Sequence, residues 1–439
     1  MKVQILSSKV IKPSIPTPLH LKQHKFSFLD QLTFPIHFGI VFFFPSGNEN
    51  TNKNYHHLEK SLSSTLSRYY PLAGRFFKGD SVVNCNDQGV EFLQAKVTGE
   101  IAGIDRESPE MELIDALVPD PVHMARSDPW PVLAVQINVF DCGGIAMGIR
   151  ILHNIGDGVS LLAFVEDWAT GNRTGLKQEK AVCCCPSFES GSVFPARELV
   201  ELMPLPPGSF RPNRLVTKCF LFSGARIAAL KSEAGAPDSE RRPSRVQVVT
   251  THIWRTLIQI SQAKHSHSRP SLLSFALSLR GRRLPFQIPE NSFGTLVGHT
   301  TVQFNPNVNN TELNTLVGLL QNAITKTSNA FARARNGDEV YSMVIDYYNE
   351  IGGHKPSEVE LCRFTSWCGF SCYGIDFGWG KPSWVATVSK GVELVFLLDD
   401  MYGDGVEAWV TLNEDDMLEF ERRYLDQFKA SPEGICSKL

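Results

Sequence analysis

Residues 145–168 read IAMGIRILHNIGDGVSLLAFVEDW, and their pattern changes twice within this short stretch. The apolar run 145–152 predicts a buried strand, and the apolar residues of 159–168 recur at helical spacing. Between them, the glycines of His153-Asn-Ile-Gly-Asp157-Gly158 permit a tight turn. We therefore predict a strand, a turn and a helix in this order, with a histidine at the exit of the strand.

The residues before this stretch predict further strands and one helix. A second apolar segment, 132–140, precedes the turn Asp141-Cys-Gly-Gly144, whose residues are typical of a β-hairpin connection. Nearer the start, the run 40–44 predicts a strand, and 55–70 predicts a helix that proline and glycine would end. The first half thus mixes both kinds of element.

The second half repeats this mixture after a stretch rich in Pro, Gly and Ser that has no sustained period. Its predicted elements are strands at 215–222, 272–279, 385–388, 393–398 and 406–412, and helices at 225–234, 244–263, 312–334, 339–351 and up to 428. A chain of 439 residues is longer than one core usually supports. We predict an α/β protein with an N-terminal domain at 1–180, a crossover at 181–214 and a C-terminal domain at 215–439.

Charge and composition argue against several classes of protein. The chain has 43 basic and 46 acidic residues, a formal charge of -3, and so lacks the basic field that nucleic-acid binding needs. Its ten cysteines match neither a zinc site nor a disulfide framework. No apolar run is long enough to cross a bilayer, and the N-terminus does not resemble a secretory signal. We expect a cytoplasmic protein without nucleic-acid or membrane partners.

His153 is the first candidate catalytic residue. An imidazole titrates near neutrality, so it can take a proton from a hydroxyl and return it later. By itself, His-x-x-x-Asp is a weak pattern, and a structural histidine with Asp157 as a charge at a helix N-terminus remains the alternative. A metal site fits poorly because ligands at i and i+4 need one continuous helical face, which the glycines interrupt.

A second motif lies in the last quarter of the chain. Thr365-Ser-Trp367-Cys368 is followed by Asp376-Phe-Gly-Trp-Gly-Lys-Pro382, whose glycines and aromatic residues predict a shaped loop. A phosphate-binding loop does not fit because Pro382 follows the lysine. A serine-hydrolase elbow does not fit because Tyr373 stands where glycine is required. A packed surface loop remains the alternative.

Together, 153–158 and 376–382, in this order and about half the chain apart, resemble the two signatures of the BAHD acyltransferases. The resemblance covers essentially the whole chain and includes Tyr70–Arg75 and Glu407–Val410. Within the family it points to the vinorine synthase-like branch of alkaloid acetyltransferases. It implies two similar-sized mixed-sheet domains of the chloramphenicol acetyltransferase-like type, with a channel between them where acyl-CoA and an acceptor meet.

The resemblance also implies a role for each site residue. His153 would deprotonate the acceptor hydroxyl, and Thr365 and the Trp367 indole N–H would stabilise the tetrahedral oxyanion. Asp157 would orient the turn by pairing with Arg280. No acyl-enzyme, metal or permanently bound cofactor is implied. Acetyl-CoA would be the co-substrate, and the protein would be a monomer.

Other residues are expected away from the reaction. The second motif would shape the domain interface and the CoA channel through Asp376, Gly378, Trp379 and Gly380. Ser244 and Arg245 would contact the CoA phosphates through a helix N-terminus and a guanidinium. For these two residues, an ordinary helix cap and a solvated charge are the alternative.

Departures from the family pattern bear on the acceptor. Gly369 stands where relatives commonly carry arginine, which leaves the nearby pocket shape open. Residues 292–295 lack the signature of anthocyanin malonyltransferases, and Gly352-Gly353 replace the arginine of shikimate and quinate acyltransferases. We therefore expect acetyl transfer to a hydroxyl of an alkaloid or a similar specialised metabolite. The alternatives are a terpenoid or aliphatic alcohol, another acyl-CoA, or a non-catalytic binding protein of the same fold.

Overall fold

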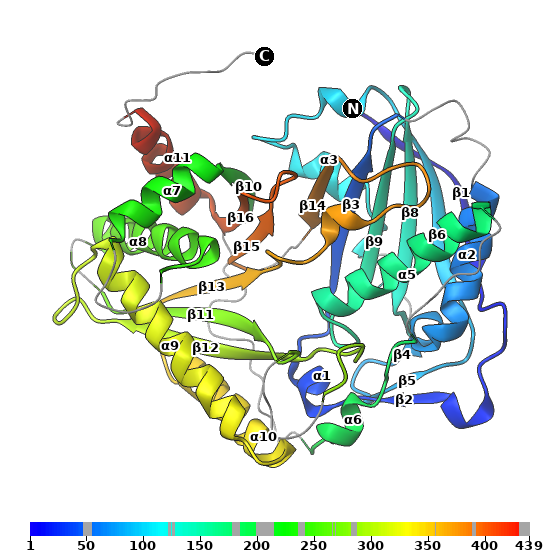
Figure 1. The fold of residues 1–439 in the computed structure, drawn as a ribbon, viewed down its shortest axis with the longest axis horizontal. Coiled ribbons are helices and arrows are strands. Elements are labelled where there is room, and N and C mark those ends of the chain that lie inside the picture. The colour runs from blue at the N-terminus through cyan, green and yellow to red at the C-terminus, as the bar shows by residue number, and fades with distance from the viewer. Residues whose placement is uncertain are drawn as a thin grey trace.

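The computed structural model describes residues 1–46, 55–121, 124, 128–177, 185–198, 215–235, 242–265, 267, 269–281, 288–355, 357–388 and 392–429. Two six-stranded mixed sheets lie side by side, with the long helices on their outer sides (Figure 1). The helices are α1 Phe28–Leu32, α2 Tyr55–Arg68, α3 Met111–Ala116, α5 Gly158–Lys177, α6 Ser190–Val193, α7 Gly224–Glu233, α8 Arg245–His265, α9 Leu313–Arg333, α10 Gly337–Gly352 and α11 Glu414–Lys429.

The first large sheet contains the predicted hairpin. Its strands, in spatial order, are β1 Val3–Ile11, β6 Val90–Val97, β8 Leu133–Phe140, β9 Ile145–Leu152, β3 His37–Phe44 and β14 Trp384–Val388. Strands β8 and β9 pair antiparallel across residues 141–144, where Gly143 has a φ of +80°. A small sheet of β2 Gln23–Lys25, β5 Val82–Asn84, β4 Arg75–Phe76 and β7 Trp130–Pro131 lies beside it.

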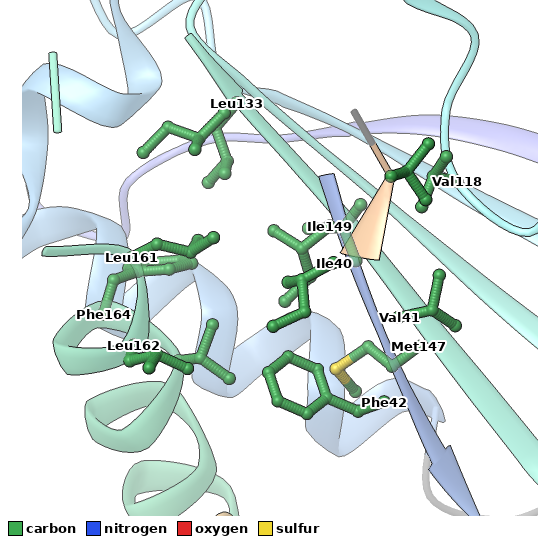
Figure 2. Close-up of a cluster of buried hydrophobic side chains, with 14 of the residues drawn as sticks. Ile40, Val41, Phe42, Val118, Leu133, Met147, Ile149, Leu161, Leu162 and Phe164 are labelled. Carbon is green, nitrogen blue, oxygen red and sulfur yellow. The ribbon is translucent and has the colours of Figure 1, made fainter. Parts of the chain in front are cut away.

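Alternating apolar side chains of β3 and β9 pack on both faces of this sheet. Figure 2 shows the face where strand residues meet α5; its labelled residues include Ile40, Phe42, Ile149, Leu161, Leu162 and Phe164. Val41 points the other way, toward Val118. Burial on both faces explains why these strands are continuous apolar runs.

The second large sheet has the order β10 Leu215–Phe222, β16 Val406–Asn413, β15 Leu394–Asp399, β13 Glu360–Ser366, β11 Ser271–Ser278 and β12 Val297–Phe304. One face packs against α7, α8, α9 and α11 in a core of its own. The other face turns toward the first sheet, and Trp367 at the end of β13 belongs to the first core. The ends of β9 and β13 therefore meet between the sheets.

The structure adds strands that the sequence analysis did not predict, among them β1, β6, β12 and β13, and it differs from the predicted elements in further ways. The strand predicted at 385–388 forms as β14. It pairs with β3 in the first sheet, although the other strands of that sheet come from the first half of the chain. Helix α5 continues past the predicted end to Lys177, because packing against the core outweighs the cost of two helical glycines. Of the predicted crossover 181–214, the structure describes only 185–198, which include α6. The boundaries 1–180 and 215–439 stay a prediction.

Candidate active site

Backbone contacts from both halves of the chain hold His153. The residue follows the last residue of β9, and its N–H donates to the Ile36 carbonyl at 2.8 Å. Its own carbonyl accepts from the Thr295 hydroxyl at 2.7 Å. The Phe38 ring lies 4.7 Å from the imidazole, between centroids. His153 is thus fixed where the two sheets meet.

The surroundings of His153 favour its neutral form. The side chain is half-buried and its Nδ1 is fully covered. This desolvation lowers the pKa of His153, while its own backbone and the Asp157 carboxylate act in the opposite direction. A neutral imidazole with Nδ1 covered leaves Nε2 as the nitrogen that can take a proton from a substrate.

An ion pair fixes the turn that follows His153. Arg280 Nη1 lies 2.6 Å from Asp157 Oδ2, and both side chains are almost fully buried. Arg280 also donates to the Ser160 hydroxyl and the Gly294 carbonyl, and Asp157 accepts from the backbone N–H groups of Ser160 and Leu296. The carboxylate therefore caps α5 and ties the turn to the second half of the chain, which matches the predicted contact between Asp157 and Arg280.

Thr365 and Trp367 reach the same region from β13. Thr365 pairs with Phe396 of β15, and the ring of Trp367, one residue beyond the end of β13, lies 5.0 Å from the Phe396 ring. The Trp367 ring is 6.0 Å from Phe38, edge to face, and it packs directly on Gly158. Among the described residues, neither the Thr365 hydroxyl nor the Trp367 indole N–H has a hydrogen-bond partner in the protein. Both donors are free to bind a ligand.

The second motif forms a tight loop. Asp376 Oδ1 accepts from the backbone N–H groups of Gly378 and Gly380 at 2.7 and 3.0 Å. These glycines have φ values of +105° and +108°, a region that favours glycine. The Trp379 ring stacks on Phe377 at 5.4 Å and contacts Phe44 of the first sheet.

This loop packs at the far end of α5 from His153. Asn172 donates to the Phe377 carbonyl at 2.7 Å, and Arg173 lies 4.0 Å from the Asp376 carboxylate. Gly158, beside the reaction centre, and Asn172 are separated by almost four turns, or about 20 Å of helix. The position of the loop supports a structural role for the second motif.

Ser244 and Arg245, the predicted CoA contacts, lie at the start of α8, and both have partners in the protein. Ser244 and Gln247 exchange hydrogen bonds between side chain and backbone, as a capping pair does. Arg245 pairs with Asp399, and Asp399 also accepts from the Gly369 N–H at 2.6 Å. These contacts favour the alternative of a helix cap for Ser244. Arg245 is ion-paired within the protein and is not the solvated charge of that alternative, and CoA binding by either residue stays a prediction.

Gly369 has its own backbone reason to be glycine. Its φ is +87°, which an arginine at this position would adopt only with strain. The conformation of the loop after Trp367 therefore favours the glycine that this chain has at 369.

Three further residues lie close to this region and were not among the predicted site residues. Thr295 binds the His153 carbonyl. His299 of β12 is close enough for its charge to interact with that of His153, and Tyr347 of α10 stacks on His299. No motif marks these residues. Thr295 precedes β12, and Tyr347 lies in the helix predicted at 339–351. His299 lies in β12, where polar residues replace the apolar alternation that indicates a strand.

Every helix among the described residues is too short or too polar to span a bilayer. No group of three or more His, Cys, Asp or Glu side chains in the same part of the chain could hold a metal ion.

Known proteins resemble this chain over nearly its full length. A family model described as the Transferase family matches residues 1–426. Limonoid 21-O-acetyltransferase of Melia azedarach is 34% identical over 424 residues, covering 96% of each chain. Stemmadenine O-acetyltransferase of Catharanthus roseus is 34% identical over 434 residues, covering 97% of each chain.

Solved structures show the same fold. The crystal structure of vinorine synthase is 30% identical and matches with a TM-score of 0.82, covering 97% of this chain and 98% of that one. The structure of Fusarium sporotrichioides TRI101 with coenzyme A and T-2 matches with a TM-score of 0.70 at 18% identity, covering 92% of this chain and 98% of that one, and supports the fold alone. The predicted two-domain α/β architecture with mixed sheets is confirmed. By family model, relatives and fold, this chain belongs to the BAHD acyltransferases and is an acyl-CoA-dependent acyltransferase.

Proposed function

We propose that this protein transfers an acetyl group from acetyl-CoA to a hydroxyl of a largely apolar specialised metabolite, with His153 as the general base. One observation carries the proposal. His153, whose pKa is lowered by burial, is fixed where the two sheets meet, in the turn on which Trp367 packs. Among the described residues, the donors of Thr365 and Trp367 have no hydrogen-bond partner. A base next to two free donors is the arrangement that attack of a hydroxyl on a thioester requires.

The proton and the bonds balance without a covalent enzyme intermediate. His153 Nε2 takes the proton as the acceptor oxygen attacks the thioester carbonyl. The tetrahedral oxyanion accepts hydrogen bonds from the Thr365 hydroxyl and the Trp367 indole N–H. Collapse forms the ester and breaks the carbon–sulfur bond, and the imidazolium returns its proton to the CoA thiolate. Asp157 and Arg280 only keep the turn in place.

The names of the relatives support acetyl transfer to alcohols. They include acetyltransferases for limonoids, benzyl alcohol and stemmadenine. We propose an alkaloid as the acceptor, with a terpenoid or aliphatic alcohol as the alternative. Gly352 and Gly353 end α10 and offer no guanidinium to an acceptor carboxylate from that position, which disfavours shikimate and quinate as acceptors. A monomer in the cytoplasm stays a prediction from the sequence.

The test is release of free CoA thiol from acetyl-CoA. The acceptors are a hydroxylated indole alkaloid, a monoterpene alcohol, benzyl alcohol and shikimate at matched concentrations. We expect release with at least one neutral or cationic acceptor and little with shikimate. His153→Ala should lower kcat/KM by about two to four orders of magnitude without changing the melting temperature.

The control is His20→Ala, which removes an exposed histidine and should leave activity unchanged. Near-normal turnover by His153→Ala would rule out the proposed base. A preference for shikimate would overturn the acceptor class and leave the chemistry intact.

A further inference from the structure

His299 lies on the face of the second sheet that carries the proposed oxyanion donors. It pairs with Ala276 across β11 and β12. Phe275 of β11 pairs with Phe364 of β13, so the next residues, Ala276 and Thr365, are also neighbours. Side chains of neighbouring residues in a sheet point to the same face. Thr365, Ala276 and His299 therefore form a row across three strands.

The three residues of this row are partly exposed, whereas the residues on the opposite face of the sheet are buried. Thr365, Ala276 and His299 are all half-buried, although β11 and β13 are interior strands. The residues that alternate with them, such as Phe275 and Phe364, are buried against the outer helices. Solvent thus reaches this row in part, and Ala276 is the small residue at its centre.

Tyr347 fixes the plane of the His299 ring. The two rings stack at 4.6 Å with an angle of 11°, and the Tyr347 hydroxyl is 2.6 Å from the hydroxyl of Ser274, which is buried. Within the part of the chain that the structure describes, the ring nitrogens of His299 have no hydrogen-bond partner. A ring held on its face and unpaired at its edge is ready to bind a ligand.

His299 also remains uncharged under ordinary conditions. Desolvation, with a smaller contribution from His153, lowers the pKa of His299 to about 4. A neutral imidazole has one donor and one acceptor. It can hydrogen-bond a hydroxyl or a carbonyl, but it cannot neutralise a carboxylate.

We propose that His299 determines acceptor specificity by hydrogen-bonding a second, neutral oxygen of the acceptor while the reacting hydroxyl lies at His153. The substrate class is then an apolar molecule with two oxygens, one acetylated and one read by His299. This inference rests on the proposed acyl transfer and adds a group that the acceptor must carry.

The test compares acceptors that differ by one oxygen. Benzyl alcohol is measured beside the three benzenedimethanol isomers, and a monoterpene alcohol beside the corresponding diol, all with acetyl-CoA. We expect wild type to prefer at least one diol over its mono-alcohol. His299→Ala should reduce kcat/KM for that diol about tenfold, the value of one hydrogen bond, and leave the mono-alcohol and the KM of acetyl-CoA unchanged.

Further variants separate the role of His299 from a structural effect. His299→Gln keeps a donor and an acceptor and should retain part of the diol preference. Tyr347→Phe keeps the stacked ring, loses the bond to Ser274 and should show a smaller loss. Gln303→Ala changes an exposed residue of the same strand and is the matched control.

Two results would overturn the inference while the wild type remains active. One is an equal loss for diols and mono-alcohols in His299→Ala, and the other is an unchanged diol preference. Absence of thiol release by wild type with every acceptor would instead count against the proposed acyl transfer itself.

Discussion

At Gly158 the backbone lies so close to the Trp367 indole that a side chain does not fit. A Cβ at this position would be 2.6 Å from the indole nitrogen. We expect Gly158→Ala to displace the indole and lower kcat by about one to two orders of magnitude, since removing an oxyanion donor costs about two to three. Initial rates of thiol release, with circular dichroism as a check on folding, measure the effect.

The same helix offers a matched control for this change. Gly175 has nothing within 4 Å of its added Cβ, so Gly175→Ala should keep full activity and slightly stabilise α5. If Gly158→Ala is as active as Gly175→Ala, Trp367 does not act at the reaction centre.

The environment of His153 sets the pH dependence of the reaction. The neutral imidazole is the reactive form of a base, and desolvation lowers the pKa of His153 below its ordinary value of about 6.5. We expect kcat/KM to be constant from pH 7 to 8 and to fall only below about pH 6.5. Rates across pH 5 to 8, limited to the range where the protein stays folded, give the midpoint. A midpoint above neutrality would contradict this account of the site.

The hairpin, turn and helix around His153 could be predicted because their signals are local. Continuous apolar strands, turn glycines and a change of period lie within a few residues of one another. Strands β12 and β13 were missed because the face that lines the site carries polar residues such as His299, Thr301, Arg363 and Thr365. These residues replace the apolar alternation that would have indicated a strand. Residues that line the site therefore make these two strands harder to predict from the sequence.

The ion pair between Asp157 and Arg280 connects two elements, and its energetics can be measured. Breaking a buried pair leaves an uncompensated charge, at a cost of about 3–5 kcal/mol. We expect Asp157→Asn and Arg280→Gln each to lower the free energy of unfolding by about this amount. The double variant should lose less than the sum, because the groups interact directly.

Urea denaturation of the wild type, both single variants and the double variant gives the coupling energy. A similar cycle between Arg422 and Glu419, an ion pair more exposed than this one, is the control and should show a coupling below about 1 kcal/mol. Additive losses for the buried pair would mean that it does not hold the turn.

At the scale of the whole molecule, the late strand β14 connects the two sheets. Its existence could be predicted from its apolar residues, but its partner β3 could not, because that pairing joins positions more than three hundred residues apart. Trp384 of β14 extends this connection. Its indole N–H donates to Glu407 of β16, in the other sheet, at 3.2 Å. The hydrogen bond from Trp384 to Glu407 therefore joins the two sheets.

Burial of Glu407 should make the stability of the whole protein depend on pH. Desolvation raises the pKa of Glu407 from 4.5 to about 8, so the folded protein keeps a proton that the unfolded chain loses above about pH 4.5. At this group the folded state binds more protons across this window, so the contribution of Glu407 to stability falls as the pH rises from about 4.5 to 8. Melting temperatures at pH 5 and pH 8.5 measure the loss.

Glu407→Gln separates this carboxyl from the other titrating groups. The amide oxygen still accepts from Trp384, and the side chain no longer titrates. At pH 5 we expect the variant to be about as stable as wild type, because both side chains are neutral there. At pH 8.5 it should be more stable, by no more than about 5 kcal/mol at 1.36 kcal/mol per pKa unit. Glu290→Gln, which changes an exposed glutamate, should have the stability of wild type at both pH values. A variant that parallels wild type across the range would show that Glu407 is ionised in the folded protein, with its charge compensated at the junction of the sheets.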